Sequence, residues 1–281
     1  MLGALIIVFR EAIEAGIIVG IVMAVTKGVP GSRLMAGAGV AAGVLGACLV
    51  AAFAGAIADA LNGVGQELFN ASILSLAVCM LAWHNIWMAS HGRELAAEAR
   101  RLGQEVRSGA RSLVALAIVV AVAVMREGSE VVLFLYGLVA AGGATARDLL
   151  IGSLLGLAAG VAVSAATYFG LATIPARRLF AVTSALIAFL AAGLASQAAS
   201  FLQQAGVVTI GSQTAWDTSA ILSDASLFGR VLHTLVGYAD QPSALQAVVY
   251  ATTLTAIFTL SKAFAARSSS RRPEAPAPQL G

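Results

Sequence analysis

The sequence predicts an all-α polytopic membrane protein with seven transmembrane helices, and three observations lead to this prediction. Of its 281 residues, 59% are hydrophobic and only 11% are charged. A soluble domain carries about 25% charged residues, so this chain cannot cover a globule with charge. Seven apolar segments also approach or exceed the roughly 20 residues that cross a bilayer. Finally, the basic residues gather in alternate loops, as they do in membrane proteins.

The seven apolar segments account for most of the chain. They lie at about 2–26, 34–59, 68–90, 112–140, 148–173, 179–202 and 244–264. No positively charged stretch precedes the first segment, as it would in a cleavable signal peptide, so we expect a permanent helix there. Gly and Ala recur at helical spacing in "AGAGVAAGVLGA" and "GSLLGLAAG". Such small residues allow transmembrane helices to pack closely.

The charge of the loops predicts the orientation of the chain. Thirteen of the 17 Lys and Arg residues fall in the loops after the first, third, fifth and seventh segments. Because Lys and Arg mark cytoplasmic loops, the N-terminus is predicted outside and the C-terminus inside. The net charge of +3 reflects this sidedness, and we expect no nucleic-acid partner.

The remaining segments are predicted to lie outside the bilayer. Residues 91–111 carry mixed charges at i,i+4 spacing, which favours a solvated cytoplasmic helix. The outer loop 203–243 has enough apolar residues to fold against the membrane face. Residues 267–281 are rich in Pro and Ala and are predicted to be a disordered cytoplasmic tail. The seven-helix transmembrane domain therefore comprises residues 1–266.

An internal repeat organises the first six segments. "REAIE" at 10–14 and "REGSE" at 126–130 share the pattern Arg-Glu-x-x-Glu at an offset of 116. Each motif begins a unit of three segments, at about 1–90 and 112–202. Three is an odd number, so the second unit is predicted to be inverted in the membrane, with the seventh helix outside the repeat. Inverted repeats whose sites meet near the midplane are a common transporter plan.

The motif places two carboxylates and one guanidinium on each of two helices. Residues three or four positions apart share a helix face, and each mid-helix charge costs about 2.5–3.5 kcal/mol on insertion scales. These charges must therefore face one another or a wet cavity. Four Glu against two Arg leave a surplus of two negative charges, which favours a cation site. A proton relay without metal and purely structural ion pairs are the alternatives. The predicted metal ligands are Glu11, Glu14, Glu127 and Glu130, supported by Arg10 and Arg126.

The identity of the cation is not fixed by these residues. Carboxylate oxygens suit hard ions, and charge alone leaves iron, manganese, magnesium and calcium open. Glu67, Asp217 and Asp224 are candidate vestibule residues on the outer side. His84, in "LAWHNIW", is better explained as a buried histidine with a hydrogen bond than as a ligand on the exit path.

The two motifs resemble those of the high-affinity iron permease family, the oxidase-dependent iron transporters, and especially its bacterial EfeU-type members. That family carries Arg-Glu-x-x-Glu in its first and fourth of seven helices, as "REAIE" and "REGSE" stand here. Many members have Gly-Leu between the two acids, where this chain has Ala-Ile and Gly-Ser. The outer-loop residues around "WDTS", with Gly237, Tyr238 and Pro242, are also similar to the bacterial members.

This resemblance implies a multi-pass permease of the cytoplasmic (inner) membrane, and no enzyme. Its substrate would be ferric iron, bound in passage by the four Glu, with no permanently bound cofactor. A separate periplasmic or extracytoplasmic iron oxidase or iron-binding protein would oxidise ferrous iron and supply it. A permease for another heavy or divalent metal such as lead remains an alternative. An intramembrane di-metal redox protein or a sensor are further ones.

Overall fold

The computed structural model describes residues 1–60, 66–141, 145–170, 176–224 and 226–270. Regular structure in these residues is helical. The helices are α1 (Leu2–Val25), α2 (Ser32–Ala60), α3 (Gln66–Arg107), α4 (Leu113–Ala140), α5 (Ala146–Tyr168), α6 (Ala176–Gln204), α7 (Leu227–Val236) and α8 (Ala244–Ser270). Each of the seven predicted segments begins within three residues of the first residue of one of these helices, so the all-α prediction is confirmed.

Five of the helices are long and apolar enough to cross a membrane. These candidate spans are 32–56 in α2, 67–88 in α3, 146–168 in α5, 180–204 in α6 and 244–264 in α8. Helices α1 and α4 are as long, with 24 and 28 residues, but each holds the three charges of its motif. Large apolar side chains cover the outside of the bundle, among them Leu49, Phe53 and Leu150. The chain is therefore a multi-pass membrane protein.

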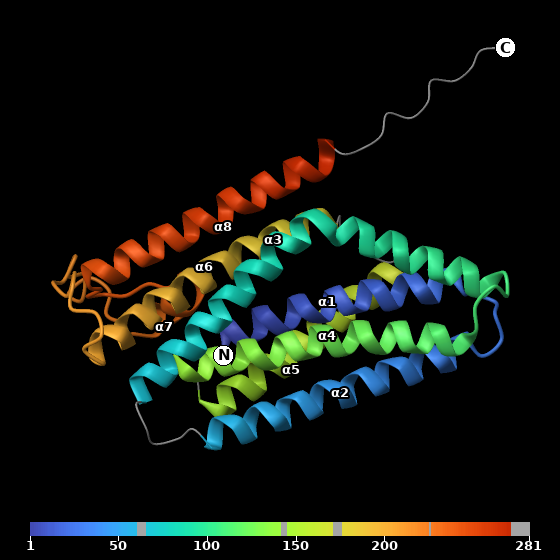
Figure 1. Ribbon diagram of the computed structural model, residues 1–281, viewed down its shortest axis with the longest axis horizontal. Coiled ribbons are helices and arrows are strands. Elements are labelled where there is room, and N and C mark those ends of the chain that lie inside the picture. Colours follow the sequence, from blue (N-terminus) through green and yellow to red (C-terminus); the bar gives the residue numbers. More distant parts are fainter. Residues whose placement is uncertain (61–65, 142–144, 171–175, 225, 271–281) are drawn as a thin grey trace, which may run out of the picture.

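Helix α3 differs most from its prediction. It runs for 42 residues, about 63 Å at 1.5 Å per residue, twice the roughly 30 Å of a hydrocarbon core. Figure 1 shows two arms that meet at a bend. The second arm was predicted as a separate, solvated helix at 91–111. It continues the span instead, and it buries Ala99 and Val106 against residues of α1, α2 and α4.

The C-terminal boundary also differs from its prediction. Helix α8 runs to Ser270, whereas the seventh segment was predicted to end at 264 and the tail to begin at 267. The remainder of the predicted disordered tail, residues 271–281, lies outside the described residues.

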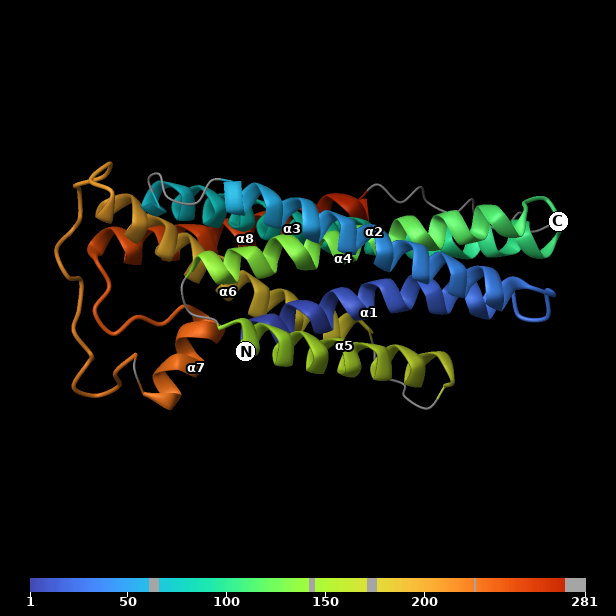
Figure 2. The same cartoon turned by 90° about the horizontal axis from the view of Figure 1, so that it is seen from below.

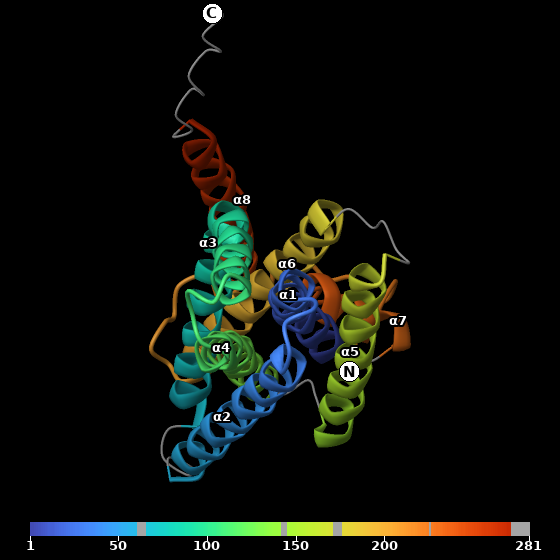
Figure 3. The ribbon, with the colours of Figure 1, turned by 90° about the vertical axis from the view of Figure 1, so that its right-hand side faces the viewer.

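Helix α1 lies near the centre of the bundle, as the view along the long axis shows (Figure 3). It packs most closely on α5, where Gly156 faces the α1 backbone. A Cβ atom at Gly156 would lie 2.5 Å from the carbonyl oxygen of Leu5. Helix α4 packs in the same way on α2, with Gly43 against the carbonyl of Ala121. Each motif helix thus pairs with the Gly-rich helix of the other repeat unit, while the first arm of α3 packs with α6 and α8.

Substitution of Gly156 by Ala is expected to lower the stability of the bundle. The added methyl group would push α5 away from α1, and overpacking of this kind costs about 1–3 kcal/mol. Gly20 on α1 is the matched control, because a Cβ atom there meets no heavy atom within 4 Å. Thermal unfolding in detergent should show a lower midpoint for Gly156→Ala and no loss for Gly20→Ala. Equal midpoints for the two variants would contradict this close packing.

Helix α7 forms a short cap at one end of the bundle, beside the N-terminus (Figure 2). Ser226 caps its start by accepting a hydrogen bond from the Gly229 backbone N–H at 2.9 Å. Gly237 ends it in the left-handed conformation, with φ of 68°, which favours glycine. The hydroxyl groups of Tyr238 and Thr218 lie 2.6 Å apart and connect the preceding part of the loop to the end of α7. The outer loop therefore contains a helix, which the sequence analysis did not predict.

Candidate metal site

The first motif lies in the middle of α1 and is completely buried. Only 1% of Arg10, 1% of Glu11 and 4% of Glu14 is exposed. Arg10 and Glu14 are one helical turn apart, and the Arg10 Nε donates a hydrogen bond to the Glu14 Oε1 at 2.8 Å. Both oxygens of Glu11 lack a hydrogen-bond partner. The motif therefore consists of a compact ion pair and a second carboxylate that remains available.

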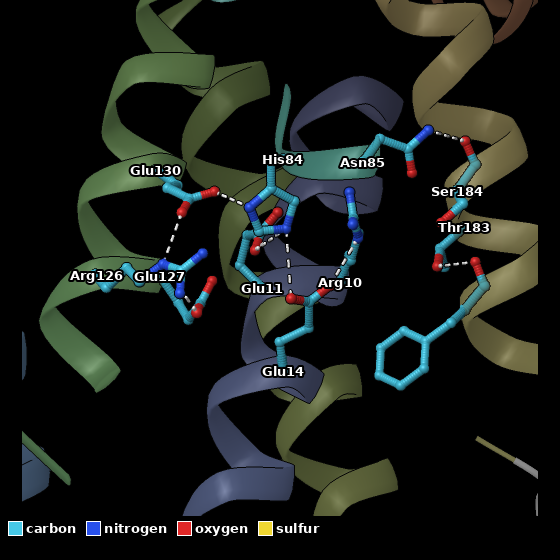
Figure 4. Close-up of polar contacts among 11 residues, drawn as sticks. Arg10, Glu11, Glu14, His84, Asn85, Arg126, Glu127, Glu130, Thr183 and Ser184 are labelled. Carbon is cyan, nitrogen blue, oxygen red and sulfur yellow. Dashed lines mark hydrogen bonds and ion pairs between the residues drawn. The ribbon is translucent and has the colours of Figure 1, made fainter. Parts of the chain in front are cut away.

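The second motif lies on α4 and faces the first across the bundle (Figure 4). The Arg126 Nε lies 3.2 Å from the Glu130 Oε1 and 3.9 Å from the Glu127 Oε1. Glu127 is buried, whereas 38% of the Arg126 side chain is exposed. Its guanidinium carbon lies 4.5 Å from the ring centroid of Trp87 on α3, a cation–π geometry. The two motifs thus share their pairing pattern and differ in how deeply the Arg side chain is buried.

His84 on α3 joins the two motifs. Its Nε2 lies 3.4 Å from the Glu14 Oε2 and 3.8 Å from the Glu11 Oε2, while its Nδ1 contacts the Glu130 Oε2. Figure 4 shows the ring between the carboxylates of α1 and α4. Only 3% of His84 is exposed. Sequence reasoning missed this role, and the one available signal was a histidine in an otherwise apolar run.

Four of these side chains bring potential ligand atoms together. One nitrogen or oxygen from each of Glu11, His84, Glu127 and Glu130 lies within 4.8 Å of all the others. A metal ion with ligands at about 2.1 Å keeps opposite ligands about 4.2 Å apart. A small contraction would therefore complete such a shell. Oxygens of Glu11, Glu127 and Glu130 remain without hydrogen-bond partners, which leaves lone pairs for an ion.

Glu14 stands apart from this group. It was predicted as an equal ligand, but its Oε1 accepts the Arg10 hydrogen bond, and its carboxylate is not among the four ligand atoms. The structure thus brings together three of the four predicted Glu and adds one imidazole. Imidazole nitrogen suits iron, zinc, copper and nickel better than magnesium or calcium. The donor set therefore favours a transition metal, which the carboxylates alone did not.

The three predicted vestibule residues are not part of this group. Glu67 is exposed in the first turn of α3, 17 residues before His84, or about 26 Å along the helix. Asp217 is exposed and accepts hydrogen bonds from the Ser219 hydroxyl at 2.6 Å and the Gln241 amide at 3.0 Å. The bonds from Ser219 are the main cause that lowers the pKa of Asp217. These contacts give Asp217 a structural part in the loop.

Asp224 is half-buried in the same outer loop. Its backbone N–H donates to an Asp240 carboxylate oxygen at 3.1 Å, and burial raises its pKa. The Asp224 Oδ1 has no hydrogen-bond partner. This arrangement places Asp224 beside a second acid of the same loop, far along the chain from the two motifs.

The fold and the site together define a multi-pass membrane protein with a buried cluster of carboxylates and imidazole. The family model of the "Iron permease FTR1 family" matches residues 1–272, and the chain belongs to that family of iron transporters. The resemblance seen in the two motifs is thereby confirmed.

Two curated relatives support the same assignment. The "Ferrous iron permease EfeU" of Escherichia coli O157:H7 is 30% identical over 257 residues, which cover 87% of this chain and 89% of the relative. The protein of the same name from Yersinia pestis is 31% identical over 254 residues, with 87% of each chain covered. No solved structure matches the chain significantly.

Proposed function

We propose that this protein carries iron across the cytoplasmic membrane and that the ion binds in passage to Glu11, His84, Glu127 and Glu130. The observation that carries the proposal is the convergence of four potential ligand atoms from three helices within 4.8 Å. Membership of an iron permease family supports iron as the cargo. Arg10 and Arg126 balance part of the negative charge, and the bound cation balances the rest.

The proposed arrangement in the membrane has seven spans, with α1 and α4 as the two that carry the charges. The exchange of partners, α1 with α5 and α4 with α2, supports two three-helix units related by inversion. The basic loops support an N-terminus outside and a C-terminus inside. In this arrangement both motifs lie near the midplane, because each is well removed from both ends of its helix.

The proposed substrate is ferric iron, supplied by a separate oxidase or iron-binding protein on the outer side. This form of the ion follows from the family resemblance of the motifs, while the two relatives are named as ferrous iron permeases. The surplus of two negative charges would be neutralised by ferrous iron and exceeded by one charge with ferric iron. Both oxidation states are therefore part of the test.

The test is uptake of radiolabelled iron into sealed proteoliposomes, with ferrous and ferric iron offered separately. The wild type should accumulate iron in at least one oxidation state, and the Glu11→Ala/Glu130→Ala variant, which lacks two of the four proposed ligands, should not. Equal accumulation by both proteins would contradict transport through this site. Iron bound by the purified protein without any accumulation would indicate a sensor or a redox protein instead, and accumulation of lead in preference to iron would indicate another cargo.

Substitution of His84 by Gln is expected to change the metal preference of uptake. The amide replaces an imidazole nitrogen with a neutral, harder oxygen donor, which suits manganese better than zinc. Competition assays should show that zinc inhibits iron uptake less, and manganese more, with at least a fivefold change in their ratio. His233→Gln is the matched control, because its Nδ1 lies 2.7 Å from the Tyr238 carbonyl in the outer loop. An unchanged ratio in His84→Gln would contradict a ligand role.

A further inference from the structure

The metal site borders a layer of apolar side chains on one side and a cavity on the other. On one side, an apolar cluster contains Ala4 and Ile7 of α1 with Phe134 and Leu138 of α4. These residues precede the motif on α1 and follow it on α4, so they lie on the predicted outer side. They are at most 9% exposed, and an ion has no polar partner among them. A layer of apolar side chains therefore lies between the site and the predicted outer side.

On the opposite side, a cavity of about 310 Å³ lies between α1, α4 and the second arm of α3. Its charged lining comprises Glu98, Arg101, Glu105, Arg111, Arg126 and Glu127. Glu127 connects the cavity directly to the metal site, since it belongs to both. Its side chain is 3% exposed, and its Oε2 has no hydrogen-bond partner. A ligand of the site thus also lines this cavity.

We infer that this cavity is the inner half of the ion path, that the structure is the inward-facing state, and that Arg126 separates the metal site from the cavity. This inference rests on the proposed function and adds to it a route and a conformational state. The second arm of α3 belongs to one of the Lys- and Arg-rich segments that are predicted to be cytoplasmic. The cavity beside it therefore lies toward the cytoplasm. A transporter that alternates access seals one side of its site while the other is open.

Arg126 is suited to this position because it is held less firmly than its counterpart Arg10. Arg10 is buried and bonded to Glu14 at 2.8 Å, whereas 38% of the Arg126 side chain is exposed. Trp87 offers the Arg126 guanidinium an aromatic face at 4.5 Å. The side chain can therefore leave Glu130 without losing every favourable contact. An ion that moves from Glu130 toward Glu127 would take its place.

The rest of the lining suits release rather than storage. A Glu105 carboxylate oxygen lies 2.9 Å from the Arg111 Nε and the other lies 3.6 Å from the Arg101 Nε, so its charge is already balanced. Three acids and three Arg give the lining no formal net charge. Conduction needs binding that is weak enough for the ion to leave. Glu98 adds an exposed carboxylate on the way out.

Thiol accessibility tests the cavity independently of transport. Val122→Cys and Ile118→Cys, each without Cys48 and Cys79, place a thiol on α4 at sites that are 54% and 57% exposed. Of these two positions, only 122 lines the cavity. A charged, membrane-impermeant thiol reagent applied to the cytoplasmic face should modify Val122→Cys at least tenfold faster than Ile118→Cys. Val119→Cys, a second lining position, should behave like Val122→Cys.

Equal modification rates at positions 122 and 118, or modification from the outer face alone, would overturn the inference. If the thiol at position 122 is modified from the cytoplasmic face but the protein transports no iron, the cavity would be supported and the proposed function would be contradicted. The two claims therefore fail separately.

Iron release tests the route itself. Glu98→Gln should slow the initial rate of iron transport at least threefold while equilibrium iron binding stays unchanged, because the metal site remains intact. Glu94→Gln is the matched control, since Glu94 is exposed on the same arm and is not among the lining residues. The same rate in Glu98→Gln and Glu94→Gln would overturn this exit route.

Discussion

Substitution of Glu11 by Gln is expected to lower iron affinity and iron uptake at least 100-fold. Gln keeps the size of the side chain but removes the charge of a carboxylate whose two oxygens have no hydrogen-bond partner. Loss of a residue that merely orients a ligand costs about 10–100-fold in metal affinity, so loss of a ligand should cost at least as much. Equilibrium dialysis with radiolabelled iron measures the affinity, and proteoliposome assays measure the uptake.

Glu94→Gln serves as the control for this experiment as well, because it removes one carboxylate from an exposed position of α3. Its affinity and uptake should stay within twofold of the wild type. A Glu11→Gln variant that also stays within twofold would show that iron does not bind to the first motif.

Substitution of Arg10 by Met is expected to be the most destabilising change in either motif. It leaves Glu14, which is 4% exposed, without its guanidinium partner inside the bundle. Removal of one partner from a buried ion pair costs about 3–5 kcal/mol, which corresponds to a fall of roughly 10 °C in the unfolding midpoint. Thermal unfolding in detergent checks this value.

The equivalent change on α4 provides the comparison. Arg126→Met should cost less than Arg10→Met, because 38% of the Arg126 side chain is exposed, whereas that of Arg10 is 1% exposed. The double variant Arg10→Met/Glu14→Gln should regain most of the stability lost in Arg10→Met, since neither charge of this ion pair is then left without the other. Equal losses in Arg10→Met and Arg126→Met would contradict the asymmetry between the two motifs.

The helices were predictable because local patterns determine them. Long apolar runs with few interruptions predicted the starts of seven helices within three residues. The Arg-Glu-x-x-Glu spacing also places Arg10 one turn from Glu14 and Arg126 one turn from Glu130, and both ion pairs form. Both results depend on residues within one or two turns of each other.

The rest depends on which helices become neighbours. His84 has no sequence neighbour that marks it as a ligand, and its contacts with Glu11 and Glu130 arise only when α3 packs against both α1 and α4. Glu14 looks equivalent to Glu11 in the sequence, but Arg10 occupies one of its oxygens. The sequence of the second arm of α3 is typical of a solvated helix because its charges are evenly spread. In the structure, the face that holds Ala99 and Leu102 is buried.

The central claim is that iron binds between α1, α3 and α4 through carboxylates and one imidazole. X-ray absorption at the iron edge of the iron-loaded, purified protein tests it most directly, with His84→Ala measured beside the wild type. The wild-type spectrum should show an oxygen-rich shell with one imidazole, and His84→Ala should lose the imidazole signal. Identical spectra from the two proteins would show that His84 does not bind the iron, and would contradict the site described for this structure.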